Sequence, residues 1–260
     1  GVKGGLFTLA TGGNYRVWGP TGTYVGGNNE IALALVMVIP LMQFLRLISV
    51  HVWVKRGLLM AMVLCGIAAL GSQSRGALLA IVAMALVMWW NSDKKVVVAV
   101  FIVVLGAALL SFMPDTWWER MATIRTYEED TSAGGRINAW WMAWNLAKAN
   151  FFGGGFMIYT GELFARYAPD PLDVHAAHSI YFMVLGEHGF VGLLLFLLMW
   201  IFVWRSAAWL RVQGRELPQS QWLSHLGAMS QVSLAGYAVG GAFLSLSYYD
   251  LPYNILILVV

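Results

Sequence analysis

Residues 173–192, DVHAAHSIYFMVLGEHGFVG, place two histidines at the start of a long apolar segment. The chain is apolar enough to cross a bilayer over residues 179–204, because about 20 such residues, each rising about 1.5 Å, span a hydrocarbon core of about 30 Å. His175 and His178 are therefore expected at a membrane surface.

The composition is typical of a membrane protein. Of the 260 residues, 59% are hydrophobic and 11% are charged, whereas about 25% of an average soluble domain is charged. Five more apolar segments are expected to be membrane helices: residues 31–47, 57–70, 77–90, 96–113 and 226–246. The predicted fold class is all-α, a polytopic transmembrane helical bundle.

The first residues of the chain are expected to form a loop, and both ends are expected to lack neighbouring helices. Residues 1–28 are rich in glycine, threonine and aromatic residues, which predicts an irregular loop with turns at Gly12-Gly13 and Gly19-Pro20. The chain begins without a methionine and stops inside a new apolar run, LPYNILILVV. We therefore expect a single membrane domain over residues 1–260 that is a fragment lacking helices at both ends.

Positive charges in the short loops predict the orientation. If residues 1–28 lie outside, the inner loops hold eight basic residues, Arg46, Lys55, Arg56, Lys94, Lys95, Arg205, Arg211 and Arg215, and the short outer segments hold three, Lys3, Arg16 and Arg75. Because short cytoplasmic loops carry the excess of positive charge, both histidines and a large loop over residues 114–178 are expected on the outer face. No basic run interleaved with aromatic residues indicates nucleic-acid binding.

The large loop contains a helical pattern. Ile137, Trp140, Trp141, Trp144 and Lys148 recur at helical spacing, which predicts a three-turn amphipathic helix along the membrane interface with its tryptophans toward lipid headgroups or a lipid ligand. Three glycines at residues 153–155 are expected to end it, either as a glycine-rich turn or as an amide nest for an anion.

Two arginines are candidates for anion binding. Arg75 lies between two apolar runs, where an arginine costs about 2.5–3.5 kcal/mol on insertion scales unless it has a partner or water. It is either an outer-loop arginine that reaches the headgroups or a clamp whose planar fork suits phosphate. Arg136 is expected to open the helix after Gly134-Gly135, where unpaired amides also favour an anion. The alternative is a plain helix-start arginine.

The two histidines are three residues apart. A metal site with Asp170 or Asp173 is one interpretation, but an HxxH pair without a further cluster is weak support for it. The other interpretation is a general base, because a group that titrates near neutral pH stands beside a membrane surface that also presents arginines.

Two carboxylates complete the candidate residues. Glu187 falls in the first turns of the long apolar segment, where a buried carboxylate usually faces the bundle interior and has a partner. It is expected either to pair with an arginine or to contact a substrate. Asp250 belongs to an outer-face polar cluster with Tyr248, Tyr249 and Tyr253, much of which is interpreted as an interfacial belt.

Three segments in this order resemble the O-antigen ligase/polymerase superfamily. They are SRGALLA at residues 74–80, GGRINAWWMAWNLAKANFFGGG at 134–155 and HAAHSIYFMVLGEHGFVG at 175–192. More narrowly, residues 1–37 and the segment SYYDLPY are similar to the O-glycosylation ligases associated with exosortase A systems in Gram-negative bacteria.

The resemblance implies a polytopic glycosyltransferase of the bacterial inner membrane, GT-C-like, inverting, metal-independent and without a cofactor. It implies transfer of a glycan from an undecaprenyl-diphosphate carrier to a periplasmic acceptor, which is a hydroxyl of a lipid, polysaccharide or protein. Arg75, Arg136 and His178 match the family's catalytic positions. We expect His175, Glu187 and Asp250 to bind substrate together with the two arginines.

Two departures from the family pattern leave the acceptor open. Ser179 stands where an asparagine usually follows the histidine, and Phe151 and Phe152 replace a proline that commonly precedes the glycine-rich turn. A polymerase shares the same donor chemistry and is an alternative. A transporter or flippase of lipid-linked glycans is an alternative of another class, although the gathering of charges at one face favours an interfacial enzyme over a site near mid-membrane.

Overall fold

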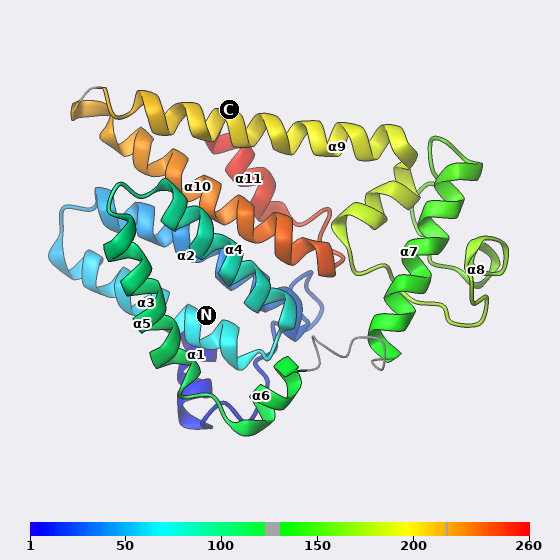
Figure 1. Ribbon diagram of the computed structural model, residues 1–260, viewed down its shortest axis with the longest axis horizontal. Helices are drawn as coiled ribbons and strands as arrows, with labels where there is room; N and C mark the ends of the chain where they lie inside the picture. Colours follow the sequence, from blue (N-terminus) through cyan, green and yellow to red (C-terminus); the bar gives the residue numbers. More distant parts are fainter. Residues whose placement is uncertain (123–130, 217) are drawn as a thin grey trace. The chain divides into compact units, whose positions relative to one another are not determined.

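The computed structural model describes residues 1–122, 131–216 and 218–260, and these contain helices and no strands (Figure 1). The α-helices are α1 (Val2–Ala10), α2 (Asn28–Ile48), α3 (Val52–Gly71), α4 (Arg75–Asn91), α5 (Lys95–Leu110), α6 (Asp115–Ala122), α7 (Thr131–Ala149), α8 (Gly161–Tyr167), α9 (Ile180–Gln213), α10 (Gln221–Gly240) and α11 (Asp250–Val259). Two 3₁₀ turns, η2 (Pro218–Ser220) and η3 (Gly241–Phe243), flank α10. The prediction of an all-helical chain is confirmed.

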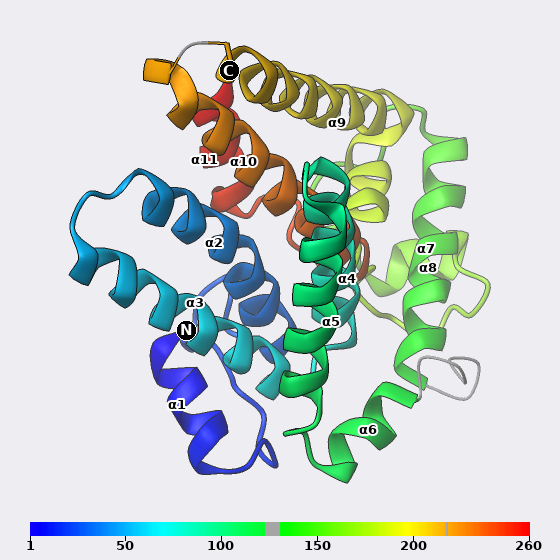
Figure 2. The same ribbon diagram turned by 60° about the vertical axis from the view of Figure 1, so that its left-hand side comes forward.

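The chain divides into two compact units. Unit 1 comprises Gly1–Met121, Val203–Gly240 and Tyr249–Val260, and unit 2 comprises Ala122–Phe202 and Gly241–Tyr248. In unit 1, α10 packs against α2 and α4, α2 packs against α3, and α3 packs against α1 (Figures 1 and 2).

Small residues let α10 approach its neighbours closely. A side chain at Gly236 would meet Met84 of α4, and one at Gly240 would meet Leu33 of α2. The buried Ser233 hydroxyl donates to the carbonyl oxygen of Met37 (2.8 Å). Close backbone contact and hydrogen bonds of this kind hold helices together where lipid removes the usual hydrophobic drive.

Among the residues that the structure describes, three helices are long and apolar enough to cross a membrane: α2, α3 and α9. The bent pair α5 and α6, at 116° to each other, raises the number to four if it is one span. Six spans are expected from the sequence, and the difference has two sources. Helix α4 has only 17 residues, about 26 Å at about 1.5 Å each. Helix α10 ends at Gly240 rather than at residue 246, and it is largely buried and partly polar.

The sequence prediction of an irregular loop is wrong for residues 2–10, which form α1, and correct for residues 11–27, which contain no helix. The turn at Gly12-Gly13 is present, but α1 precedes it. The glycines that indicate a loop serve instead for helix packing, because a side chain at Gly5 would strike the backbone of Leu64 in α3. Glycine disfavours a helix by about 1 kcal/mol, and tertiary packing overrides that preference here.

Helix α9 is broken at Gly189, within the segment interpreted from sequence as one span. Gly189 has φ 66° and ψ −164°, a conformation that only glycine adopts readily. The freed backbone groups are hydrogen-bonded to the glycine-rich turn: the amides of Gly154 and Gly155 donate to the carbonyls of Gly186 and Glu187, both at 2.9 Å. The carbonyl groups at the break in α9 are therefore hydrogen-bonded within unit 2.

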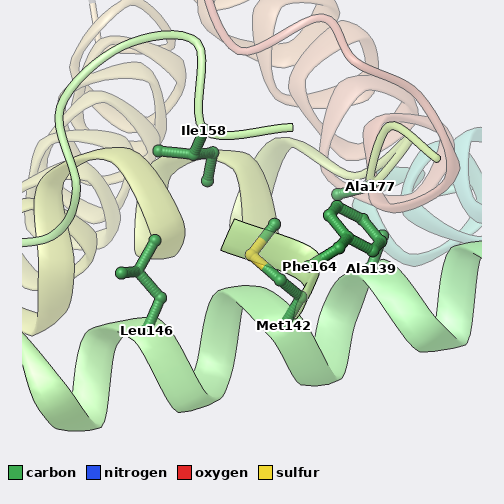
Figure 3. Close-up of a cluster of buried hydrophobic side chains, with 6 residues drawn as sticks. All are labelled: Ala139, Met142, Leu146, Ile158, Phe164 and Ala177. Carbon is green, nitrogen blue, oxygen red and sulfur yellow. The ribbon is translucent and has the colours of Figure 1, made fainter. Parts of the chain in front are cut away.

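The apolar core of unit 2 lies on one face of α7. Ala139, Met142 and Leu146 point from that helix toward Ile158, Phe164 and Ala177 (Figure 3). Helix α8 supplies Phe164 and begins at the cap residue Thr160, whose hydroxyl accepts from the Leu163 amide. This core fixes the connection between α8 and α9 against α7.

Candidate functional site

The connection that carries the two histidines is held by side chains of α7. The Asn138 amide nitrogen donates to the carbonyl oxygens of Asp170 (2.8 Å) and Asp173 (3.0 Å), and its oxygen accepts from the Asp170 amide (2.9 Å). Two turns further along α7, Asn145 donates to the carbonyl of Tyr167 (2.9 Å). All hydrogen-bonding atoms of the Asn138 side-chain amide are thus directed at the loop.

Trp140 holds the other end of this loop. Its indole nitrogen donates to the carbonyl oxygen of Ala177 (2.7 Å), the residue before His178. Its ring stacks on Phe182 with a centroid separation of 4.9 Å. The prediction that all the tryptophans face lipid is therefore wrong for Trp140, whereas Trp141 and Trp144 are exposed.

His178, His175 and Arg136 lie together. The His175 ring packs on the backbone beside Arg136, since a side-chain carbon at Gly135 would lie 2.7 Å from the His175 Nδ1. His175 Nδ1 is also 2.6 Å from Asp173 Oδ1. His178 has a left-handed backbone, φ 43°, which costs an ordinary residue about 1–2 kcal/mol. The surrounding hydrogen bonds hold it in that conformation.

The electrostatic environment keeps His178 neutral. Burial lowers the pKa of His178 below its ordinary value, and the charges of Arg136 and His175 lower it further. A histidine with a lowered pKa carries an unprotonated nitrogen at neutral pH and can accept a proton.

Arg136 does not open its helix. Helix α7 begins at Thr131, so the unpaired amides of its first turn belong to residues that precede Arg136. The expectation that Arg136 and these amides share one anion site is therefore wrong. Helix α7 therefore runs through Gly134 and Gly135 without a break. Arg136 instead projects from the second turn, beside the histidines.

Glu187 is buried and pairs with a tyrosine rather than with an arginine. The hydroxyl of Tyr248 donates to Glu187 Oε2, and the same hydroxyl lies 2.8 Å from His188 Nε2. Burial and the Glu187 carboxylate raise the pKa of Tyr159. The Tyr159 hydroxyl is buried and forms no hydrogen bond with a described residue, so hydrogen bonds do not connect Glu187 through Tyr159 to the histidine loop.

The glycine-rich turn does not form an amide nest. The Gly153 amide donates to the carbonyl of Asn150 (2.8 Å), and the next two amides bind the broken part of α9. With all three donors engaged, the interpretation as a turn is correct.

Arg75 lies in unit 1, at the first position of α4. The preceding loop is buried and extensively bonded: Ser74 caps α4 by accepting from the Ala77 amide (3.2 Å), and Asn28 donates to the carbonyl of Ser72 (2.9 Å). An arginine at a helix start is disfavoured by the helix dipole. An anion at this place would be attracted by both the guanidinium and the helix end.

Gln73 brings two further arginines to the Arg75 loop. Gln73 is buried and left-handed, φ 57°. Its side-chain oxygen accepts from Arg16 Nε (3.3 Å), and its carbonyl oxygen accepts from Arg120 Nε (2.9 Å). From the sequence alone, these two arginines are interpreted only as outer-loop charges. Arg16 and Arg120 lie 57 and 47 residues from Gln73, so no local pattern links them.

Asp250 is the exposed first residue of α11 in unit 1, where a carboxylate is favoured by the helix dipole. Its role in substrate binding stays a prediction. Within the ranges that the structure describes, no group of three His, Cys, Asp or Glu side chains is placed to hold a metal ion.

The fold and these contacts define a multi-pass helical membrane protein in which two histidines precede a spanning helix and α7 holds their loop. The family model of the O-antigen ligases matches residues 60–197, which is more than half of the chain and contains Arg75, Arg136, both histidines and Glu187. The chain belongs to the O-antigen ligase family. Family members are glycosyltransferase-like ligases that act on a lipid-linked glycan and an acceptor. No curated protein matches the chain.

Removing Asn138 should impair the site without removing a reacting group. We expect Asn138→Ala to lower glycan transfer by about 10- to 100-fold, because small misplacements of a catalytic group carry penalties of that size. Rates of the single variant, of His178→Ala and of the double variant measure the effect. If Asn138 acts by positioning His178, adding Asn138→Ala to His178→Ala changes nothing further. A further fall in the double variant would contradict that role.

Proposed function

We propose that the protein transfers a glycan from an undecaprenyl-diphosphate carrier to an acceptor hydroxyl on the periplasmic side of the inner membrane. The observation that supports the proposal is the histidine loop, which side chains of α7 hold in place and in which the pKa of His178 is lowered by burial, Arg136 and His175. When a hydroxyl attacks and a diphosphate leaves, a base is needed to take the hydroxyl proton, and fixed cations are needed to stabilise the charge on the diphosphate. Family membership supports the ligase chemistry.

The residues have separate roles in the proposed step. The acceptor oxygen bonds to the anomeric carbon of the donor sugar as the bond from that carbon to the diphosphate oxygen breaks. His178 takes the hydroxyl proton, and the bonding electrons leave with undecaprenyl diphosphate. Arg75 and Arg136 offset the charge that develops on this leaving group. The anomeric configuration inverts because the attack is a single displacement.

Arg16 and Arg120 extend the proposed diphosphate site. Both are held at Gln73 through Nε, two residues before Arg75. A diphosphate carries several negative oxygens, and adjacent guanidinium groups suit such a ligand better than one alone. His175, Glu187 and Asp250 are proposed to contact the glycan or the acceptor.

The broken helix α9 is the feature that most favours a transporter, because transporters often bind substrate at interrupted helices. In such sites the unwound carbonyls and helix ends face the substrate. Here the Gly186 and Glu187 carbonyls accept from the glycine-rich turn. The enzyme therefore accounts for the break better than the flippase does.

The proposed function is tested on cells with and without the protein. Mass spectrometry of periplasmic glycoconjugates should identify a lipid, polysaccharide or protein that loses its glycan when the protein is absent. Loss of chain length with the first repeat still attached would instead assign a polymerase. Glycoconjugates that are unchanged in both amount and structure would contradict the transferase.

The topology can be tested by thiol labelling in a Cys65→Ser background. Leu172→Cys, in the histidine loop, should react with a membrane-impermeant maleimide in intact spheroplasts, and Gln219→Cys, between α9 and α10, should react only after lysis. Both native side chains are exposed, so access is decided by the membrane. The reverse pattern would invert the orientation and remove the periplasmic site.

The pH dependence of transfer should report the effect of the Arg136 charge on the pKa of His178. Because the pKa of His178 is lowered, the acid limb of the rate profile should lie below about pH 6.5, the ordinary value. Arg136→Gln removes one cause of the lowering, so the limb should move to higher pH. Arg136→Lys keeps the charge and should leave the limb in place. A limb at one pH in all three proteins would show that His178 is not the titrating base.

A further inference from the structure

A cavity of about 290 Å³ lies in unit 1, where α4 and α9 end and α10 begins. Arg75 is the first residue of α4 and the cavity lies at its last, Asn91. The two places are therefore separated by the length of that helix, about 26 Å. This cavity is outside the site of the proposed transfer reaction.

The lining carries an excess of positive charge. Arg211 donates to the side chain of Asn91, and the Ser224 hydroxyl donates to the Arg211 carbonyl (2.8 Å). Arg215 lies 3.5 Å from Asp93, but both side chains are largely exposed, at 53% and 82%. Such an exposed pair contributes little to stability because solvent screens it. Two guanidinium groups therefore face one weakly held carboxylate.

Exposed tryptophans around the cavity indicate that it lies at the depth of the lipid headgroups. Each of the three helices around it has an exposed tryptophan next to its lining residues: Trp90 on α4, Trp209 on α9 and Trp222 on α10. The Lys95 ammonium lies 5.3 Å from the Trp90 ring centre. Tryptophan and lysine are enriched at this level because their rings and stems are apolar and their polar ends are wet.

We propose that this cavity binds the phosphodiester headgroup of an anionic phospholipid. The guanidinium groups of Arg211 and Arg215 recognise the phosphate oxygens. The acyl chains lie along the exposed apolar surface of α9, which includes Trp209 and Val212. Free phosphate has no acyl chains to bury on that apolar surface. A zwitterionic headgroup carries a positive charge, which the positive lining repels.

Native mass spectrometry of the delipidated protein, titrated with phosphatidylglycerol or phosphatidylcholine, tests the proposal. Phosphatidylglycerol should bind the wild type more tightly, and Arg211→Gln with Arg215→Gln should weaken it by about fivefold for each arginine removed. Asp93→Asn should act in the opposite direction and strengthen binding by a similar factor. The matched control is Arg166→Gln, an exposed arginine paired with Glu162 in unit 2, which should change nothing.

A second variant keeps the test valid if the arginine variants fail to fold. Ala228 lines the cavity, so Ala228→Phe should fill it and weaken phosphatidylglycerol binding with every charge in place. Equal binding of the two lipids, or no response to Asp93→Asn and Ala228→Phe, would overturn the proposal. Displacement of the lipid by millimolar inorganic phosphate would also overturn it, because it assigns the cavity to the free anion.

Discussion

His178→Ala should nearly abolish glycan transfer while leaving donor binding largely in place. General-base assistance is typically worth 10²- to 10⁴-fold, and the lowered pKa of His178 keeps its imidazole ready to accept a proton. The measurement is the transfer rate at saturating donor, together with donor affinity and the amount of protein in the membrane. A folded His178→Ala protein that transfers at a near wild-type rate would remove His178 from the mechanism.

His175→Ala is the matched control for that variant. His175 is the more exposed of the two, and its Nδ1 faces Asp173 rather than a reacting group. We expect its loss to reduce transfer less than the loss of His178. If the pair bound a metal ion, both variants would fail equally and a chelator would inhibit. That result would replace the base with a metal site.

Replacing Arg75 or Arg136 should produce the second large loss. Alanine at either position should reduce transfer by about 10²- to 10³-fold, the range observed when one stabilising donor of a transition-state charge is removed. Lysine keeps one charge but not the bidentate fork, so it should restore only part of the rate. Transfer rates and donor affinities of the four variants are the measurement.

The neighbouring arginines provide the controls. Arg16→Gln and Arg120→Gln should weaken donor affinity by smaller factors, because these side chains bind Gln73 and extend the site. Arg166→Gln, paired with Glu162 on the surface of unit 2, should have no effect. Normal transfer by Arg75→Ala would favour the interpretation that Arg75 only reaches the lipid headgroups.

The sequence predicts those helices that depend only on neighbouring residues along the chain. The apolar runs of α2, α3 and α9 were recognised because spanning a membrane needs only length and hydropathy. His175 and His178 are candidates because they stand beside such a run, and Arg136 is a candidate because it follows Gly134-Gly135 in a helical pattern; their roles stay predictions. For α10 the sequence predicts a span that ends at residue 246, whereas the helix ends at Gly240. Its buried face mixes serine and glycine with apolar residues, so hydropathy does not mark its end.

Long-range contacts were not predictable in this way. Gln73 collects Arg16 and Arg120 from distant parts of the chain, and Asn138 holds a loop more than 30 residues away. The only sequence signal for Asn138 is its spacing of seven from Asn145, which places both on one face of a helix. The break at Gly189 depends on the glycine-rich turn that packs against it.

The most direct test of the central claim is the release of undecaprenyl diphosphate by the purified protein in proteoliposomes that contain a carrier-linked glycan and an acceptor. The proposed displacement predicts one undecaprenyl diphosphate released for each glycan that appears on the acceptor, and none with His178→Ala. Movement of the intact donor across the bilayer without release would contradict the transferase and assign a flippase.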